Sequence, residues 1–270
     1  MISCLYPSQI RHEEAGLIQV PCSRCKYCRI HRKQAWIGRL RLEAMDHRLK
    51  CFTTLTYEDN NVKDLQYGDV QRFLRSYRKN RQGQKIRFFC VGEYGKKTAR
   101  PHWHLLMFGT KVPTECKEWP HGFTYTGECN YKSIGYVAGY TLKDSTRPET
   151  LVRCSKDPAI GFNRIARYGR HLAKVSPRLA NVPNSIKISG RSYPFHPNAY
   201  RYFCEEYERH GGVITDKRDV WQAAEEYYYK RYLCRLDPTL EPSVRGDKSA
   251  QEQDIALRSK GNGSTRVKKI

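Results

Sequence analysis

The 270-residue sequence lacks any apolar run that could cross a membrane, because no segment approaches the roughly 18 consecutive apolar residues that a span requires. Its first residues also lack the charged region and apolar stretch of a signal peptide. Acidic residues are scarce, with 27 Asp and Glu against 49 Lys and Arg. We therefore expect a cytoplasmic chain with no membrane association, whose formal charge of +22 favours a polyanionic partner.

Aromatic residues are common in this basic chain, and 19 tyrosines are interleaved with the cations along most of its length. Basic side chains attract phosphate backbones without reading sequence, while aromatic rings stack on unpaired bases. The combination favours single-stranded or locally melted nucleic acid. Charge alone distinguishes neither DNA from RNA nor an enzyme from a packaging protein.

The pattern of apolar residues is typical of an α+β domain. β-branched and alternating residues predict strands over 51–57, 86–93 and 102–108, the last two joined by a turn at Gly95. Apolar residues at i, i+3, i+4 and i+7 from Val70 predict an amphipathic helix that is capped by Asp69. A helix carrying Tyr136 and Tyr140 completes the expected core.

The chain shows no internal repeat, and its composition changes along its length. The tail has few apolar residues, so we expect it to be disordered. Helices are expected from Pro197 to His210 and over about 220–236. The predicted division is a Cys-rich basic leader at 1–50, a catalytic core at 51–150, a helical C-terminal extension at 151–237 and a tail at 238–270.

Two histidines, His102 and His104, alternate with apolar residues in the third predicted strand. Side chains two apart on a strand share a face about 6.6 Å apart, so both imidazoles can reach one divalent ion. A hairpin would return Glu93 beside them, and two neutral nitrogens with one carboxylate suit a catalytic Mg²⁺ or Mn²⁺. The alternative is that both histidines are ordinary hydrogen-bonded residues and Glu93 pairs with a cation of the turn.

Tyr136 and Tyr140 are four residues apart, so on a helix their hydroxyls would lie on one face. A phenol has a pKa of about 10, so forming phenolate at pH 7 costs about 4 kcal/mol. A polarised phosphate and the ammonium of Lys143 can largely offset that cost. The pattern predicts two nucleophiles with Lys143 as their cation, and favours Tyr140 because Lys143 follows it by three residues. The alternative is one face of an ordinary packed helix.

Three cysteines, Cys22, Cys25 and Cys28, are each separated by two residues, which suits a tetrahedral Zn²⁺ site. Cys4 is available as the fourth ligand, and His31 competes with it. A bacterial iron–sulfur run would need a further Cys followed by Pro, and the sequence has basic residues there. The remaining cysteines show no ligand spacing, and an odd total of 11 in a cytosolic chain argues against a disulfide framework. The alternative is a leader with untethered thiols.

These motifs resemble, in order and spacing, those of rolling-circle replication initiators of the HUH endonuclease superfamily. The resemblance is carried by residues 52–57, by the His102–His104 pair and by the Tyr136–Tyr140 doublet. More narrowly, the stretch from Pro21 through Trp36, with residues 91–95, 100–104 and 160–162, looks like the replication initiator of gokushovirus-type Microviridae, which are small single-stranded-DNA phages. The likeness extends over about residues 1–200.

The resemblance implies an HUH endonuclease-like central antiparallel sheet flanked by helices. It implies that one tyrosine attacks the phage origin DNA, which gives a 5′-phosphotyrosine and a free 3′-hydroxyl that primes the host DNA polymerase. The second tyrosine would cleave the regenerated origin, and the released single strand would be joined into a circle. No Gly-x₄-Gly-Lys-Ser/Thr loop is present, so unwinding would fall to a host helicase in the bacterial cytoplasm.

Basic residues of the leader and of the histidine motif are the expected DNA contacts, namely Arg29, Arg32, Lys33, Arg39 and Arg100. Two other functions stay open at this point. One is an HUH transposase or plasmid relaxase that uses the same histidine chemistry. The other is a non-catalytic zinc-containing nucleic-acid-binding protein whose histidines and tyrosines are structural.

Overall fold

A computed structural model describes residues 4–12, 16–58, 64–81, 84–95, 99–113, 116–142, 150–180 and 182–215. The chain divides into two units, residues 1–28 with 217–270, and residues 29–216, and each is described by itself. Lys143, Cys234, the helix expected over about 220–236 and the predicted tail all lie outside the described residues. Within the described part, no helix combines the length and apolar character that crossing a membrane requires.

In the first unit, β1 (Ser8–His12) and β2 (Gly16–Val20) pair as an antiparallel hairpin. The chain then reaches the start of α1 (Lys26–Asp46). Cys28 is in the first turn of this helix, and the rest of the helix belongs to the second unit.

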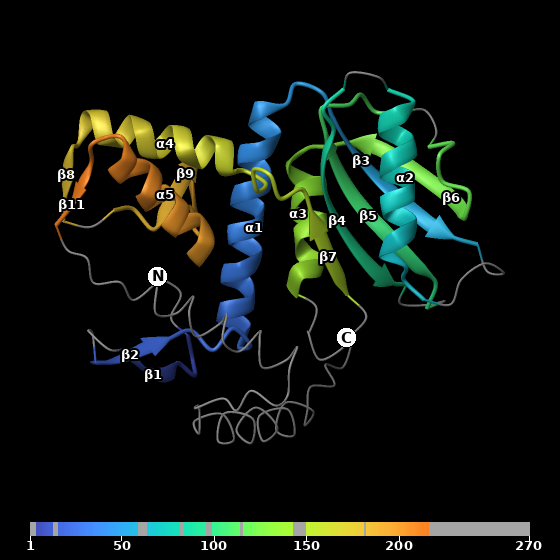
Figure 1. Cartoon of the computed structure of the whole chain (residues 1–270). Coiled ribbons are helices and arrows are strands. Elements are labelled where there is room, and N and C mark those ends of the chain that lie inside the picture. The colour runs from blue at the N-terminus through green and yellow to red at the C-terminus, as the bar shows by residue number, and fades with distance from the viewer. Residues whose placement is uncertain are drawn as a thin grey trace, which may run out of the picture. The chain divides into compact units, whose positions relative to one another are not determined.

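The second unit is built on a five-stranded antiparallel sheet with the order β6-β3-β5-β4-β7 (Figure 1). The three predicted strands are confirmed within one residue at each end, and the α+β class is confirmed with them. The sequence did not predict β6 or β7, which form the two edges of the sheet. The strands are β3 (Lys50–Tyr57), β4 (Arg87–Tyr94), β5 (Pro101–Phe108), β6 (Gly122–Glu128) and β7 (Leu151–Cys154).

Side-chain alternation in β5 sends Trp103 and Leu105 to one face, where they are buried with the apolar side of α2 (Tyr67–Lys79). Gly92 lies opposite Trp103, and a Cβ there would come within 2.8 Å of the indole ring. The predicted cap of α2 is wrong. The helix begins after Gln66, and Asp69 lies inside its first turn, where its buried carboxylate accepts a hydrogen bond from a buried tyrosine.

The other face of the sheet is covered by α1 and α3 (Tyr131–Gly139). Leu40 of α1 and Val137 of α3 are fully buried in one cluster with Leu106 of β5. A short 3₁₀ turn, Tyr140–Leu142, follows α3. The histidines of β5 lie on the same face as these helices.

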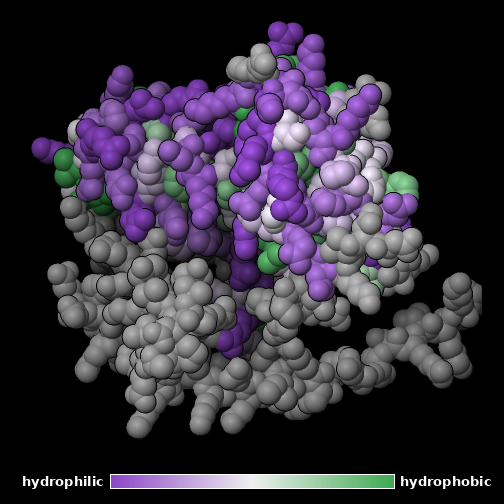
Figure 2. All heavy atoms as spheres, turned by 45° about the vertical axis from the view of Figure 1, so that its right-hand side comes forward, coloured by the Kyte–Doolittle hydropathy of each residue, from purple (hydrophilic) through white to green (hydrophobic). Residues whose placement is uncertain are grey.

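The remaining described elements are helical and contain short strand pairs. The helix predicted from Pro197 is confirmed as α5, and it packs against α4, which the sequence did not predict. Figure 2 shows that the described residues present a mostly hydrophilic surface on the side drawn. These elements are α4 (Phe162–Val175), β8 (Arg178–Leu179), β9 (Ser185–Ile188), β10 (Arg191–Pro194), α5 (Pro197–Arg209) and β11 (Val213–Ile214).

A buried ion pair ties three of these elements together. Glu43 of α1 accepts hydrogen bonds from the Arg87 guanidinium of β4 and, at 2.7 Å, from the N–H of Gly161 just before α4. Burial alone would raise the pKa of Glu43, but bonds from His47, Arg87 and Gly161 outweigh it and lower the pKa to about 2. Glu43 therefore remains a carboxylate in the core.

Candidate functional site

Glu93, His102 and His104 meet on one face of the central sheet. Glu93 is the register partner of His102 across β4 and β5, so the expected hairpin arrangement is confirmed. Oε1 of Glu93 lies 3.0 Å from Nε2 of His102 and 3.4 Å from Nε2 of His104. The candidate ligand atoms of the three residues all lie within 4.8 Å of one another, which is compatible with a single bound metal ion.

A second contact orients each imidazole. The carbonyl oxygen of Arg100, which can only accept, lies 3.1 Å from Nδ1 of His102, so that nitrogen carries the proton and Nε2 faces Glu93 with a lone pair. Oγ1 of Thr54 lies 3.0 Å from Nδ1 of His104 and can orient that ring in the same way. Two acceptors that face each other repel unless a cation lies between them, so this donor set fits a metal ion.

Burial also keeps both histidines neutral. Burial lowers the pKa of His102, and burial together with the neighbouring His102 lowers the pKa of His104 to about 3. Neutral imidazoles keep the lone pairs that a metal requires.

The two tyrosines lie directly beside these histidines. A capping box between Asn130 and Ser133 begins α3 and fixes the start of the helix that carries Tyr136. The hydroxyl of Tyr136 lies 3.5 Å from Nε2 of His104, and the hydroxyl of Tyr140 donates to it across 2.5 Å. The predicted pairing of the two phenols is therefore confirmed, although Tyr140 is the C-cap of α3 and begins the 3₁₀ turn.

Tyr136 and Tyr140 differ in their surroundings. Tyr136 is 50% exposed, whereas the ring of Tyr140 stacks on His104 with 4.9 Å between centroids. Burial raises the pKa of Tyr140, and the hydrogen bond to Tyr136 raises it further. The described geometry therefore favours Tyr136 as the more accessible nucleophile, which is the reverse of the preference read from the sequence.

The basic residues predicted to assist the site fall in different places. Lys143 lies outside the described residues. Nζ of Lys33 lies 3.8 Å from the point where a Cβ on Gly139 would sit, so this lysine is close to the end of α3 that carries Tyr140. Arg39 donates to the carbonyl of Ile160 at 3.0 Å and packs over an aromatic ring at 4.3 Å, which is a packing role. Arg29, Arg32 and Arg100 are half-buried.

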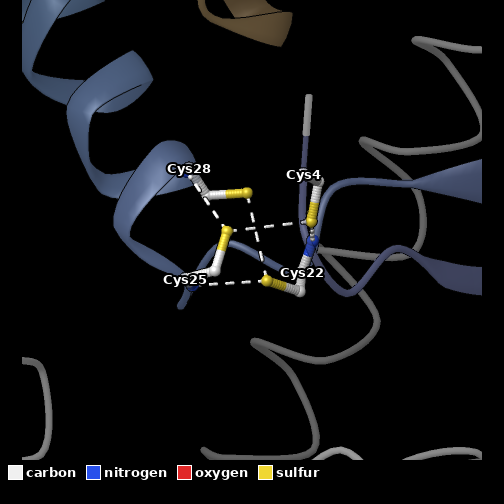
Figure 3. A group of neighbouring side chains, drawn as sticks. All are labelled: Cys4, Cys22, Cys25 and Cys28. Carbon is white, nitrogen blue, oxygen red and sulfur yellow. Dashed lines mark hydrogen bonds between the residues drawn. The ribbon is translucent and has the colours of Figure 1, made fainter. Parts of the chain in front are cut away.

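The four cysteines of the first unit converge on one point (Figure 3). Sulfurs of Cys4 and Cys25 lie 3.9 Å apart, those of Cys22 and Cys28 lie 4.0 Å apart, and all four lie within 4.8 Å of one another. Backbone N–H groups of Cys22, Cys25 and Cys28 point at sulfurs over 3.2–3.5 Å. Among the described residues, the grouping includes Cys4 and not His31 as the fourth candidate ligand.

The cysteines outside this group show no such convergence in the described part of the chain. They are free thiols, as predicted. Those that are buried lie in the sheet domain at Cys51, Cys90, Cys116 and Cys129, and those that are half-buried are Cys154 and Cys204.

Comparisons with known proteins agree with this site. Residues 50–145, which include both histidines and both tyrosines, match the family model of replication-associated proteins of the ORF2 type. The chain is 34% identical over 172 residues to Replication-associated protein ORF4 of Chlamydia phage 1, covering 54% of this chain and 42% of the relative. It is 29% identical over 199 residues to Replication-associated protein VP4 of Bdellovibrio phage phiMH2K, covering 61% and 63%.

A third relative is Replication-associated protein ORF2 of Spiroplasma virus 4, with 30% identity over 153 residues, 46% of this chain and 48% of that protein. The chain thus spans about half the length of the curated relatives it matches. No solved structure matches it. The resemblance to replication proteins of gokushovirus-type Microviridae is confirmed by these relatives.

The sequence analysis did not identify Thr54 as a partner of His104. Alternation along 51–57 places its side chain on one face with Phe52, but only the register between β3 and β5 brings it opposite His104. That register depends on the whole sheet, and no local spacing encodes it.

Proposed function

We propose, from its similarity to phage replication-associated proteins, that this chain starts rolling-circle DNA replication by nicking single-stranded DNA at an origin through an HUH-type site. The observation that carries the proposal is the position of the Tyr136 hydroxyl, 3.5 Å from one of two histidines that converge with Glu93. A nucleophile and a cation site in contact are what phosphoryl transfer to a tyrosine requires.

The cation site would be held by Glu93, His102 and His104, which suit Mg²⁺ or Mn²⁺. When bound, the ion would act as a Lewis acid on a non-bridging phosphate oxygen. Thr54 and the carbonyl of Arg100 hold the two imidazoles so that their Nε2 atoms face Glu93. The protein thus presents a rigid set of donors on two neighbouring strands.

Tyr136 is the first nucleophile in this proposal. Its phenol oxygen forms a bond to phosphorus, the bond from phosphorus to the 3′ oxygen breaks, and that oxygen takes up a proton to leave a 3′-hydroxyl. The products are a 5′-phosphotyrosine and a primer end. Tyr140, held 2.5 Å from Tyr136, serves as the second nucleophile in the cleavage that ends the round. Lys33 and Lys143 are the cations proposed to assist ionisation.

The wider function follows from the same chemistry. The phosphotyrosine conserves the phosphodiester energy, so the released strand can be joined into a circle without a nucleotide. Extension of the 3′-hydroxyl requires the host polymerase and helicase in the bacterial cytoplasm. We retain the division at about residues 50, 150 and 237 as part of the proposal, with Arg29, Arg32, Lys33 and Arg100 as DNA contacts.

Incubation of the protein with a labelled single strand that carries the phage origin, in Mn²⁺ or Mg²⁺, tests this function. We expect a labelled adduct that survives denaturation in the parent protein and is lost in His102→Ala and His104→Ala. A parent protein that binds the strand without any adduct would support the non-catalytic binder. Full cleavage by the His102→Ala/His104→Ala double variant would contradict the metal site.

We also propose that the four converging cysteines bind one structural Zn²⁺. Sulfurs at the corners of a tetrahedron with Zn–S bonds of about 2.3 Å lie about 3.8 Å apart, close to the 3.9 and 4.0 Å in this chain. Hydrogen bonding from Cys28, opposed in part by burial, lowers the pKa of Cys22 to about 4, so one thiolate is favoured in the protein itself. The ion would tie the segment at Cys4 to the first turn of α1.

Metal analysis of protein purified without chelator tests the zinc site. We expect one zinc per chain in the parent and in the control Cys204→Ser, and loss of zinc in Cys25→Ser. Loss should also lower DNA affinity, because α1 carries Arg29, Arg32 and Lys33. Absence of zinc from the parent, or iron in its place, would contradict the proposal.

A further inference from the structure

Phe123 and Tyr125 are exposed on the edge strand β6, with 59% and 64% of their surface accessible. They are two residues apart, so their rings lie on one face of the sheet. Large aromatic side chains gathered on an open face are uncommon unless a ligand or partner covers them.

The strand register places these rings on the face of the cation site. Phe123 pairs with Thr56 of β3, and Thr56 pairs with His102 of β5. The next row on this face runs from Tyr125 to Thr54 and His104. Directly opposed residues point to the same side of a sheet. Each ring therefore lies two strands, or about 10 Å, from a histidine of the site.

Phe52 makes the aromatic surface continuous between β6 and the nucleophile. Its ring centroid lies 6.2 Å from that of Tyr125 and 6.1 Å from that of Tyr136, both in edge-to-face geometry. Gly127, the next residue of β6 on this face, adds no side chain, and the Tyr125 hydroxyl lies 3.5 Å from where its Cβ would be. Aromatic rings thus extend from the open edge of the sheet to the site.

From this placement, we infer that Phe123 and Tyr125 form a stacking platform for unpaired bases of the single strand that enters the site. The inference rests on the proposed function, since it requires the cleaved phosphate to lie at the histidines. A separation of about 10 Å corresponds to about three stacked nucleotides at a rise of about 3.4 Å. Single-stranded DNA fits this surface because its bases offer flat faces and its phosphates match the net charge of +22.

Equilibrium binding in EDTA tests the platform without any cleavage. The probes are an oligo-dT strand of about twenty nucleotides and an abasic strand of the same length, which keeps the phosphates but has no bases. Stacking on one aromatic side chain strengthens binding about 5- to 150-fold. We expect Phe123→Ala/Tyr125→Ala to weaken oligo-dT binding at least about tenfold and to leave abasic-strand binding unchanged.

Two further variants complete the experiment. Tyr125→Phe keeps the ring and should bind oligo-dT like the parent. Tyr131→Ala removes an aromatic side chain that is 47% exposed but contacts Arg41 and Arg191, and it should also bind like the parent. Unchanged oligo-dT binding by the double variant, or equal weakening of both probes, would overturn the inference. Adduct formation by the parent is scored separately, so a failure of the nicking proposal is distinguishable from a failure of the platform.

Discussion

At the residue scale, the difference between Tyr136 and Tyr140 gives the first prediction. Tyr140 donates to Tyr136 and its own pKa is raised by burial, so Tyr136 should be the faster nucleophile. In single-turnover adduct assays, we expect Tyr136→Phe to slow adduct formation by at least about tenfold, the scale of about 1.4 kcal/mol, and Tyr140→Phe to slow it less. The double variant should be inert. A faster rate for Tyr136→Phe than for Tyr140→Phe would reverse the order of use.

Thr54 gives the second prediction at this scale. Thr54→Val has nearly the same shape but removes the oxygen that lies 3.0 Å from His104. Changes to such outer partners typically cost about 10- to 100-fold in metal affinity or activity. We expect the Mn²⁺ concentration for half-maximal adduct formation to rise by about tenfold or more. Thr124→Val, on β6 and opposite Leu55, is the matched control and should keep the parent value. Equal metal titrations for both variants would show that Thr54 does not position His104.

At the element scale, the Glu43 ion pair connects α1, β4 and the start of α4. Glu43→Gln should destabilise the folded protein by roughly 3 kcal/mol, because it leaves the Arg87 guanidinium buried without its carboxylate. Glu205→Gln, on a half-exposed ion pair within α5, should change stability by less than about 1 kcal/mol. Denaturant unfolding measures both, and equal values for the two variants would contradict the stabilising role of Glu43.

The same carboxylate also gives a dependence on pH. Its pKa falls from an ordinary value of 4.5 to about 2 in the folded chain. A lowered folded-state pKa stabilises the fold above 4.5, and the contribution disappears as the pH falls toward 2. The loss of stability between those values should be smaller in Glu43→Gln than in the parent. Parallel stability profiles for the two proteins would show that Glu43 does not contribute.

Also at the element scale, local patterns predicted the strands that carry the site. Alternation in 51–57 and 102–108 indicates β3 and β5 directly, and the short turn at Gly95 brings Glu93 back beside His102. The sequence did not indicate β6, because Phe123 and Tyr125 occupy the positions where a half-buried strand would carry polar residues. The Asp69 cap was wrong because that carboxylate is used in the core instead. Contacts set by register or by tertiary packing are not encoded locally.

At the scale of the whole molecule, DNA binding should depend on dispersed charge and be separable from chemistry. For single strands, the slope of log K against log salt is about −0.7 per neutralised phosphate. We expect Lys33→Ala to reduce the magnitude of that slope by about 0.7, and His102→Ala to leave it unchanged while nicking is lost. A salt series of binding isotherms measures both. Loss of binding in His102→Ala would indicate that the histidines hold DNA instead of acting in cleavage.

The most direct test of the account is to locate the covalent bond. The parent protein is incubated with Mn²⁺ and a single strand of the origin, digested with nuclease and protease, and its peptides are analysed by mass spectrometry. The account predicts a nucleotide attached by its 5′ phosphate to the hydroxyl of Tyr136, with a smaller amount on Tyr140, and none in His102→Ala. A nucleotide on another residue, or cleavage of the strand with no covalent adduct, would contradict it.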